Sequence, residues 1–272
     1  MAEACDGKDQ SALVFPNRKS GLPMSNMALL SVLARMNRDD ITVHGFRASF
    51  QNWAIDQTDF AEEIIDQALA LSHLSYARPS RRPYRGRDTF EKRRDLMVAW
   101  DSYCTKTEAA RRAKDDLIAL SQHSDPHKRG KELERTLNAL FAACGVLITE
   151  DFRRTGDAGG VVEQVDGVIE VDHELFLVEM KWWAEKISHA ELGPHLSRLM
   201  LRSGVSGLFI SNSGYTPSAI EAAVGFLNQR VLVLCTVDEI VVLLERGDDL
   251  IEFLRKKIRS ARLERKPFKE IL

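Results

Sequence analysis

The stretch with the clearest chemical potential is QVDGVIEVDHELFLVEMKWW, residues 164–183. It carries Asp166 on one apolar run, and Glu179 and Lys181, two residues apart, on the next. Because residues i and i+2 of a strand point to the same side, Glu179 and Lys181 would project together. A hairpin turn near Asp172-His173 would bring Asp166 opposite them. Two carboxylates and an ammonium in one small volume can hold a divalent metal ion and polarise a phosphodiester, so this stretch predicts a metal-dependent nuclease.

The same stretch also fits a half-buried hairpin with one solvated polar face, in which Leu175, Leu177 and Met180 would face the core. Its neighbours favour the chemical interpretation. Gly167, next to Asp166, permits a bend or the close approach of a substrate. The preceding segment RRTGDAGGVVEQ is glycine-rich and basic, which suits a mobile loop near phosphates.

Further side chains extend the predicted site. Glu134 lies on the preceding helix, within KELERTL, and would supply another metal ligand directly or through water. Gln164 lies two residues before Asp166 and would share its face, either supporting the site from behind or being solvated. Trp182 and Trp183 would stack on nucleobases, although at least one of them is expected in the core.

The segments that must position these residues alternate between helix and strand over residues 130–272. A helix over KELERTLNALFAACG should end at Gly145. Strand-like runs VLITEDFRR, EQVDGVIEV and ELFLVEMKW follow, and then helices alternate with the apolar strands GLFIS and RVLVLCT before a helical end. Strands paired first by a hairpin and then linked through helices predict an α/β domain with a mixed sheet flanked by helices.

The part before this domain is helical and basic over residues 11–104. Helices are expected over residues 24–36, with Ser25 or Asn26 as the cap, and over 44–57, 62–71 and 90–104. A charged helical linker over residues 105–129 follows. Its end is placed at SQHSDPHKRGK, where Pro126 and Gly130 would break the helical pattern.

Composition sets the wider limits. The chain has 272 residues and a net charge of −2, so only local clusters of charge could make a case for nucleic acid. The four cysteines are scattered, without a CxxC pair that would suggest zinc. No apolar run reaches the roughly 18 residues that span a bilayer, and the N-terminus lacks the apolar core of a signal peptide. A soluble cytoplasmic protein without a membrane partner is expected.

The C-terminal half resembles the PD-(D/E)XK nuclease superfamily, and within it the Mrr-like type IV restriction endonucleases. The family pattern is a helix with a Glu, a strand with an Asp, and (D/E)-x-K on the next strand, which Glu134, Asp166, Glu179 and Lys181 match. The later text GLFISNSGYTPSAIEAA is also similar. Val165 precedes Asp166 where the superfamily name has Pro. The resemblance covers roughly residues 128–254.

This resemblance implies a Mg²⁺-dependent endonuclease acting on DNA, with Mn²⁺ as an alternative ion. Asp166 and Glu179 would bind the metal through hard oxygen ligands. Lys181 would orient the attacking water and stabilise the charged transition state. Cutting both strands with one site per chain would favour a homodimer.

The N-terminal segment resembles the C-terminal catalytic part of a phage-type tyrosine recombinase. The matching text comprises VFPNRKSGLPMSNMALLSVLARM, DITVHGFRASFQNWA, DQALAL and PYRGRDTFEKRRDLMVAWDSYC. The family's H-x-x-R residues bind the scissile phosphate and its Tyr forms a covalent phosphotyrosine, which carries over to His44, Arg47 and Tyr84.

Two departures weaken this second resemblance. The family's first catalytic Arg and its hairpin Lys lie upstream of H-x-x-R, and nothing before Val14 would supply them. The family's ALAH reads ALAL here, which puts Leu71 at the position of the His. A relic that still contacts DNA phosphates is one interpretation, because the segment carries a basic cluster that includes Arg81, Arg82, Arg85 and Arg87. A solvated charged loop is the other.

Three functions therefore stay open. The first is a metal-dependent DNA endonuclease of a restriction system or a mobile element, fused to a truncated recombinase piece. The second is a tyrosine recombinase that acts through Tyr84. The third is a non-catalytic DNA-binding protein in which both sites are relics.

Overall fold

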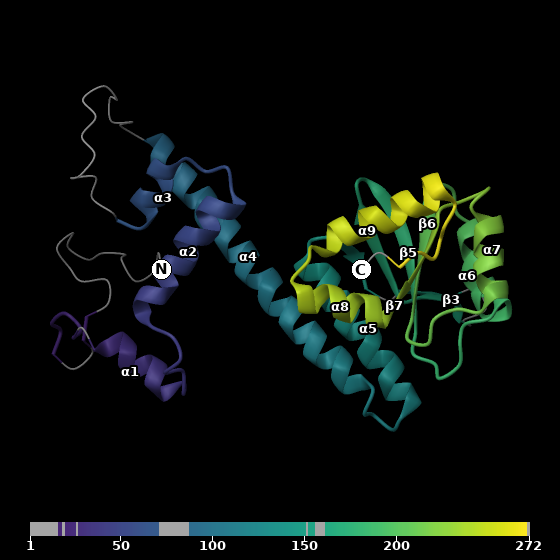
Figure 1. The fold of residues 1–272 in the computed structure, drawn as a ribbon, viewed down its shortest axis with the longest axis horizontal. Coiled ribbons are helices and arrows are strands. Elements are labelled where there is room, and N and C mark those ends of the chain that lie inside the picture. The colour runs from purple at the N-terminus through teal and green to yellow at the C-terminus, as the bar shows by residue number, and fades with distance from the viewer. Residues whose placement is uncertain are drawn as a thin grey trace. The chain divides into compact units, whose positions relative to one another are not determined.

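The computed structural model describes residues 16–17, 20–25, 27–70, 87–150, 152–155 and 161–270. Contacts divide the chain into two compact units, Met1–Trp100 and Asp101–Leu272 (Figure 1). The residues of the expected linker, 105–129, lie in the second unit. The predicted boundaries after residues 104 and 129 stay a prediction.

The described part of the first unit is helical. It contains α1 (Ala28–Arg35), α2 (Val43–Gln57), α3 (Glu62–Ala68) and the beginning of α4 (Arg87–Leu120). The Thr42 side chain caps α2 by accepting a hydrogen bond from the Gly45 amide. Rings of Phe50, Trp53 and Trp100 pack together, with centroids 4.9 Å apart for the two tryptophans. This aromatic cluster holds α2 against α4.

Helix α1 is shorter than predicted. It begins at Ala28, and its N-cap Met27 makes no side-chain cap bond. The Ser25 backbone carbonyl accepts a hydrogen bond from the Ala28 amide. The Ser25 side chain does not cap the helix, because the residue lies two positions before the N-cap Met27. Asn26 lies outside the described residues. Of the predicted apolar face only Leu33 is buried, whereas Met24 is 44% exposed.

Helix α4 runs without interruption where two helices were predicted. No glycine or proline lies between the expected helix over 90–104 and the residues of the expected linker as far as Leu120, so the backbone hydrogen bonds continue. The last part of α4 packs into the core of the second unit through Ala113, Leu117 and Leu120. Residues 105–120 of the expected linker are therefore the second half of a helix with one buried face.

Helix α5 (Pro126–Ala143) starts earlier than predicted. Pro126 was expected to break the helix, but it occupies the first turn, where a proline lacks no needed hydrogen bond. Asp125 caps this end by accepting from the amides of His127 and Lys128. Gly130 lies inside the helix. The predicted helix end is confirmed, since Gly145 follows with a φ of 74°.

The second unit is built on a five-stranded sheet in the order β1-β4-β5-β6-β7. Its strands are β1 (Leu147–Thr149), β4 (Gly167–Val171), β5 (Glu174–Lys181), β6 (Val205–Ser211) and β7 (Leu232–Thr236). Strand β4 pairs antiparallel with β1 and β5, whereas β5, β6 and β7 are parallel. Strands β2 (Phe152–Thr155) and β3 (Val161–Val165) form a separate antiparallel pair. The predicted mixed sheet flanked by helices is confirmed.

The predicted hairpin turn is also confirmed. Asp172 and His173 join β4 to β5 with φ angles of 51° and 65°. Two consecutive left-handed residues match the twist of a tight antiparallel hairpin. The turn fixes the register, in which Gly167 lies opposite Val178 and Val171 opposite Glu174.

Helices cover both faces of the sheet (Figure 1). One core contains residues of α5, α8 (Val237–Arg246) and α9 (Leu250–Arg259), and the other contains residues of α6 (His189–Met200) and α7 (Pro217–Phe226). Strand β5 contributes Val178 and Met180 to the first core and Leu177 to the second. Leu175, predicted to face the core, is 37% exposed because it lies near the start of the strand, beyond the helices' cover. The strand is thus buried on both faces rather than on one.

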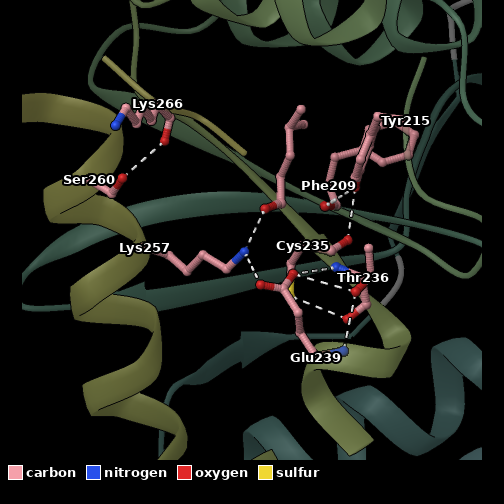
Figure 2. A network of polar contacts seen from close by, with 9 residues as sticks. Phe209, Tyr215, Cys235, Thr236, Glu239, Lys257, Ser260 and Lys266 are labelled. Carbon is pink, nitrogen blue, oxygen red and sulfur yellow. Dashed lines mark hydrogen bonds and ion pairs between the residues drawn. The ribbon is translucent and has the colours of Figure 1, made fainter. Parts of the chain in front are cut away.

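A buried polar network joins α8 and α9 to the sheet (Figure 2). The Lys257 ammonium pairs with Glu239 and donates to the Leu234 carbonyl at 3.2 Å. Glu239 also accepts from the Thr236 amide at 3.0 Å, as part of the box that caps α8. Tyr215 donates to the Phe209 and Cys235 carbonyls. Within the described part of the chain, no helix combines the length and apolar character that crossing a membrane requires.

Candidate active site

The hairpin brings the predicted acids together at one end of the sheet. Gly167 pairs with Val178, so continuing the register by one residue places Asp166 opposite Glu179. Both residues are buried, with exposed fractions of 4% and 5%. Glu179 projects from the face of β5 that carries Leu177, the face covered by α6. Two buried carboxylates thus face one another between the sheet and a helix.

Lys181 lies between these carboxylates. Its Nζ atom is 2.7 Å from Glu179 Oε1 and 3.6 Å from Asp166 Oδ2. The Lys181 side chain is 27% exposed, so the ammonium reaches toward solvent while the two acids do not. The spacing of Glu179 and Lys181 along the strand thus places them together, as predicted.

The backbone around Asp166 is anchored from two sides. Asp166 Oδ2 accepts from the Met180 amide at 2.9 Å. Its carbonyl accepts from Asn138 Nδ2, also at 2.9 Å, across to helix α5. A Cβ atom on Gly167 would lie 2.7 Å from Asn138 Oδ1. Gly167 therefore makes room for the Asn138 side chain, and the predicted close approach of a substrate stays a prediction.

Helix α6 adds two residues that sequence reasoning missed. Arg198 donates through Nη1 to Glu179 Oε2, and His195 Nδ1 lies 3.8 Å from the same oxygen. Their spacing of three residues, which places both on one helical face, was visible in the sequence. The sequence did not indicate that this face lies above Glu179.

Electrostatics differ between the two acids. Burial raises the pKa of Asp166, and the Glu179 carboxylate raises it further. Burial opposes ionisation of Glu179, but its pKa is lowered, mainly by Lys181 and to a smaller extent by His195 and Arg198. Burial would lower the pKa of Lys181, but Glu179 and then Asp166 raise it instead. Glu179 is therefore the more strongly neutralised acid and Asp166 the less well compensated one.

His195 is neutral at pH 7. It is 1% exposed, and burial lowers its pKa to about 4. Its Nε2 atom is buried without a hydrogen-bond partner. At neutral pH the cations beside Glu179 are therefore Lys181 and Arg198. His195 contributes buried, uncharged packing beside the same carboxylate.

A cleft of about 940 Å³ opens beside these residues, lined by α5 and the end of β5. Glu134, Lys131 and Arg135 line it from α5, and Lys181 and Trp183 line it from the strand side. Glu134 is half-buried, and its charge contributes to the raised pKa of Lys181, so it lies near the site. Its role as a further metal ligand stays a prediction. Asp166 and Glu179 do not line the cleft but lie behind Lys181.

The two tryptophans have separate environments. Trp182 is 8% exposed and belongs to the core, whereas Trp183 is 43% exposed at the cleft. Both residues line the cleft, but the larger exposed fraction of Trp183 makes its ring the better placed of the two to meet a ligand. The backbone of Gln164 pairs with Arg153 across the β2–β3 pair, but its side chain lies outside the described residues.

The donor set suits a hard divalent cation. In the described ranges, no three His, Cys, Asp or Glu side chains form a cluster that could hold a metal ion. Asp166 and Glu179, however, both lie within 3.6 Å of one ammonium, so their carboxylates share a small volume in which a cation is already favoured. Two carboxylates with water completing the shell is a usual arrangement for Mg²⁺.

Most residues of the recombinase-like pattern lie outside the part of the chain that the structure describes. His44 and Arg47 lie exposed on α2, and Arg47 donates to the Leu69 carbonyl after α3. Tyr84, Arg81, Arg82 and Arg85 lie outside the described residues, as does Leu71. The side chain of Arg87, at the start of α4, is also not described. The relic interpretation therefore stays a prediction.

A match to a known protein family lies within the second unit. Residues 127–251 match the Mrr_cat family model, described as a restriction endonuclease. No curated protein matches the chain. A similar solved structure is the DNA modification-dependent restriction endonuclease AspBHI, with 16% sequence identity and a TM-score of 0.34 over 55% of this chain. The chain spans 40% of that protein's length. The five-stranded sheet and its helices match a restriction endonuclease-like domain, as predicted.

Proposed function

We propose that the chain is a divalent-metal-dependent endonuclease that hydrolyses phosphodiester bonds in DNA. One observation carries the proposal: Lys181 Nζ lies 2.7 Å from Glu179 and 3.6 Å from Asp166, at the meeting point of two paired strands. The family match over residues 127–251 supports the reaction class. Mg²⁺ is the proposed physiological ion, with Mn²⁺ as a working substitute.

Each residue has a proposed role. Asp166 and Glu179 would hold the ion, which when bound would activate a water molecule and neutralise charge on the phosphate. Lys181 would orient the attacking water and donate to a non-bridging phosphate oxygen. Water adds to phosphorus while one ester P–O bond breaks, which leaves a phosphomonoester and a hydroxyl. Glu134 would support Lys181 through its charge or bind through water.

DNA would approach through the cleft. Lys131 and Arg135 on α5 are exposed there and would contact phosphates without reading bases. Trp183 would stack on a base beside the cut. Homodimerisation and a place in restriction or in a mobile element belong to this proposal, as does a cytoplasmic location.

A plasmid cleavage assay tests the proposal. With MgCl2 or MnCl2 the wild-type chain should convert supercoiled DNA to nicked and linear forms, and chelation with EDTA should stop this conversion. Asp166→Ala and Lys181→Ala should each reduce the rate by at least about a hundredfold, because the first removes a ligand of the ion and the second removes the ammonium that stabilises the charged transition state. The matched control is Lys186→Ala, since Lys186 is exposed on the loop after β5.

Cleavage that survives both active-site substitutions would overturn the proposal. So would cleavage that proceeds equally in EDTA. DNA retention without cutting of any plasmid would favour the non-catalytic alternative instead.

A further inference from the structure

Glu179 is held by cations from two different elements. Its Oε1 atom forms an ion pair with Lys181 Nζ, on the same strand, at 2.7 Å. Its Oε2 atom forms an ion pair with the guanidinium of Arg198, on helix α6. The carboxylate side chain is only 7% exposed, so solvent contributes little to its stabilisation. Both oxygens of a proposed metal ligand are therefore already occupied by positive groups.

The charges in direct contact balance without a metal ion, since two carboxylates, Asp166 and Glu179, face two cations, Lys181 and Arg198. Glu134 adds one negative charge farther away, where it acts on Lys181. A divalent cation added at the carboxylates would still leave a net excess of positive charge in a largely buried volume. Such an excess is costly in a medium of low polarity. One of the two resident cations must therefore withdraw when the ion binds.

Arg198 is the cation better suited to withdraw. Lys181 lies within 3.6 Å of both acids, so moving it would break two ion pairs. Among the acids of the described ranges, only Glu179 lies within ion-pair distance of Arg198. Its side chain is 22% exposed, so the guanidinium can move into water without crossing the core. Arg198 also lies in the last turn of α6, where the helix dipole stabilises a positive charge. This stabilisation remains when the guanidinium has moved away from Glu179.

We propose that Arg198 is the internal counter-cation of Glu179, which a divalent metal ion displaces when it binds. Arg198 is a positioning residue in this role: it pairs with the buried carboxylate and orients it before the ion arrives. It also limits metal affinity, because binding must first break the Arg198–Glu179 pair. The inference rests on the proposed metal site.

Direct metal binding tests the inference without measuring cleavage. MnCl2 is titrated into the full chain by calorimetry, for the wild type, Arg198→Met and Arg246→Met. Arg246 is the matched control, since it is an exposed arginine in the last turn of α8. Arg198→Met should bind Mn²⁺ about tenfold more tightly than the wild type, which corresponds to about 1.4 kcal/mol. Arg246→Met should bind as the wild type does.

Thermal melting gives the second measurement. Without metal, Arg198→Met should melt below the wild type, because Glu179 loses one of its two counter-cations. Saturating MnCl2 should reduce this difference in melting temperature, since the ion replaces the missing positive charge. By linkage, the smaller difference and the tighter Mn²⁺ binding both report the coupling between Arg198 and the ion.

The sign of the affinity change decides the outcome. A residue that merely supported the fold would give weaker Mn²⁺ binding when removed, so equal or weaker binding by Arg198→Met would overturn the inference. If that variant does not fold, Arg198→Lys serves instead; its shorter side chain should give a smaller increase in affinity, and no increase would again overturn the inference. Failure of the proposed function is a separate result: the wild type would then show no Mn²⁺ binding that Asp166→Ala abolishes.

Discussion

At the residue scale, the position of Asp166 depends on a contact that a single methyl group would disturb. Asn138 donates to the Asp166 carbonyl from α5, and its Oδ1 atom lies where a Cβ on residue 167 would project. The glycine after Asp166 is thus a packing requirement. It ties the candidate active site to the helix that also carries Glu134.

Gly167→Ala should lower the free energy of unfolding by about 1–3 kcal/mol, because the buried Asn138 amide must shift. Urea denaturation measures the change. Asn138→Ala in the same chain removes the clash, so the double variant should lose less than the sum of the two single losses. Strict additivity would contradict the proposed contact.

The adjacent tryptophans should respond in opposite ways. Trp182→Ala should cost about 3–5 kcal/mol of unfolding free energy, since the ring is in the core. Trp183→Ala should change stability by less than about 0.5 kcal/mol, since the ring is at the cleft. It should weaken binding to DNA in CaCl2 by about 1–3 kcal/mol through lost stacking, measured by fluorescence anisotropy. Unchanged DNA affinity would remove Trp183 from the proposed interface.

At the element scale, α8 and α9 depend on one buried ion pair. Lys257 and Glu239 are 1% and 7% exposed, and the pair joins the two helices beside the edge strand β7. The segment after α9 also reaches this strand, because Leu234 N donates to the Pro267 carbonyl at 2.9 Å. An otherwise open edge of the sheet is thereby partly covered.

Lys257→Met should destabilise the chain by about 3–5 kcal/mol, because it leaves Glu239 buried without its cation. Adding Glu239→Gln should recover much of this loss, since the amide oxygen can still accept from the Thr236 amide. Thermal and urea unfolding of the three variants test this expectation. A double variant no more stable than Lys257→Met would show that the charge itself is not the cause.

At the scale of the whole molecule, every described residue of the candidate active site lies in the second unit, Asp101–Leu272. This unit has its own cores on both sheet faces, and the end of α4 is part of one of them. The first unit has a smaller core around Phe50, Trp53 and Leu96.

A fragment of residues 101–272 should therefore fold cooperatively and keep the metal-dependent cleavage expected of the full chain. Circular dichroism melting and the plasmid assay measure these properties, with Lys181→Ala in the same fragment as the control. Loss of cutting by a folded fragment would show that the first unit contributes to the site or to DNA binding.

The sequence by itself determined the local order of the site. Alternation along β5 put Glu179 and Lys181 on one side, and the short Asp172-His173 segment indicated the turn that brings Asp166 opposite them. The order of helix, hairpin and alternating strands predicted the mixed sheet. These features depend on residues close together in the chain, where backbone geometry alone fixes which side chains are neighbours.

Only the tertiary structure decided which distant residues complete the site. Asn138 contacts Asp166 from helix α5, and Arg198 contacts Glu179 from helix α6. Neither helix carries a sequence pattern that indicates which strand it packs against. Packing around β5 and the segment that follows it likewise buried Trp182, left Trp183 at the cleft, and left Leu175 exposed near the start of the strand. Periodicity tells which face of an element is apolar, but packing decides what that face meets. The buried charge balance around Glu179 follows from that packing.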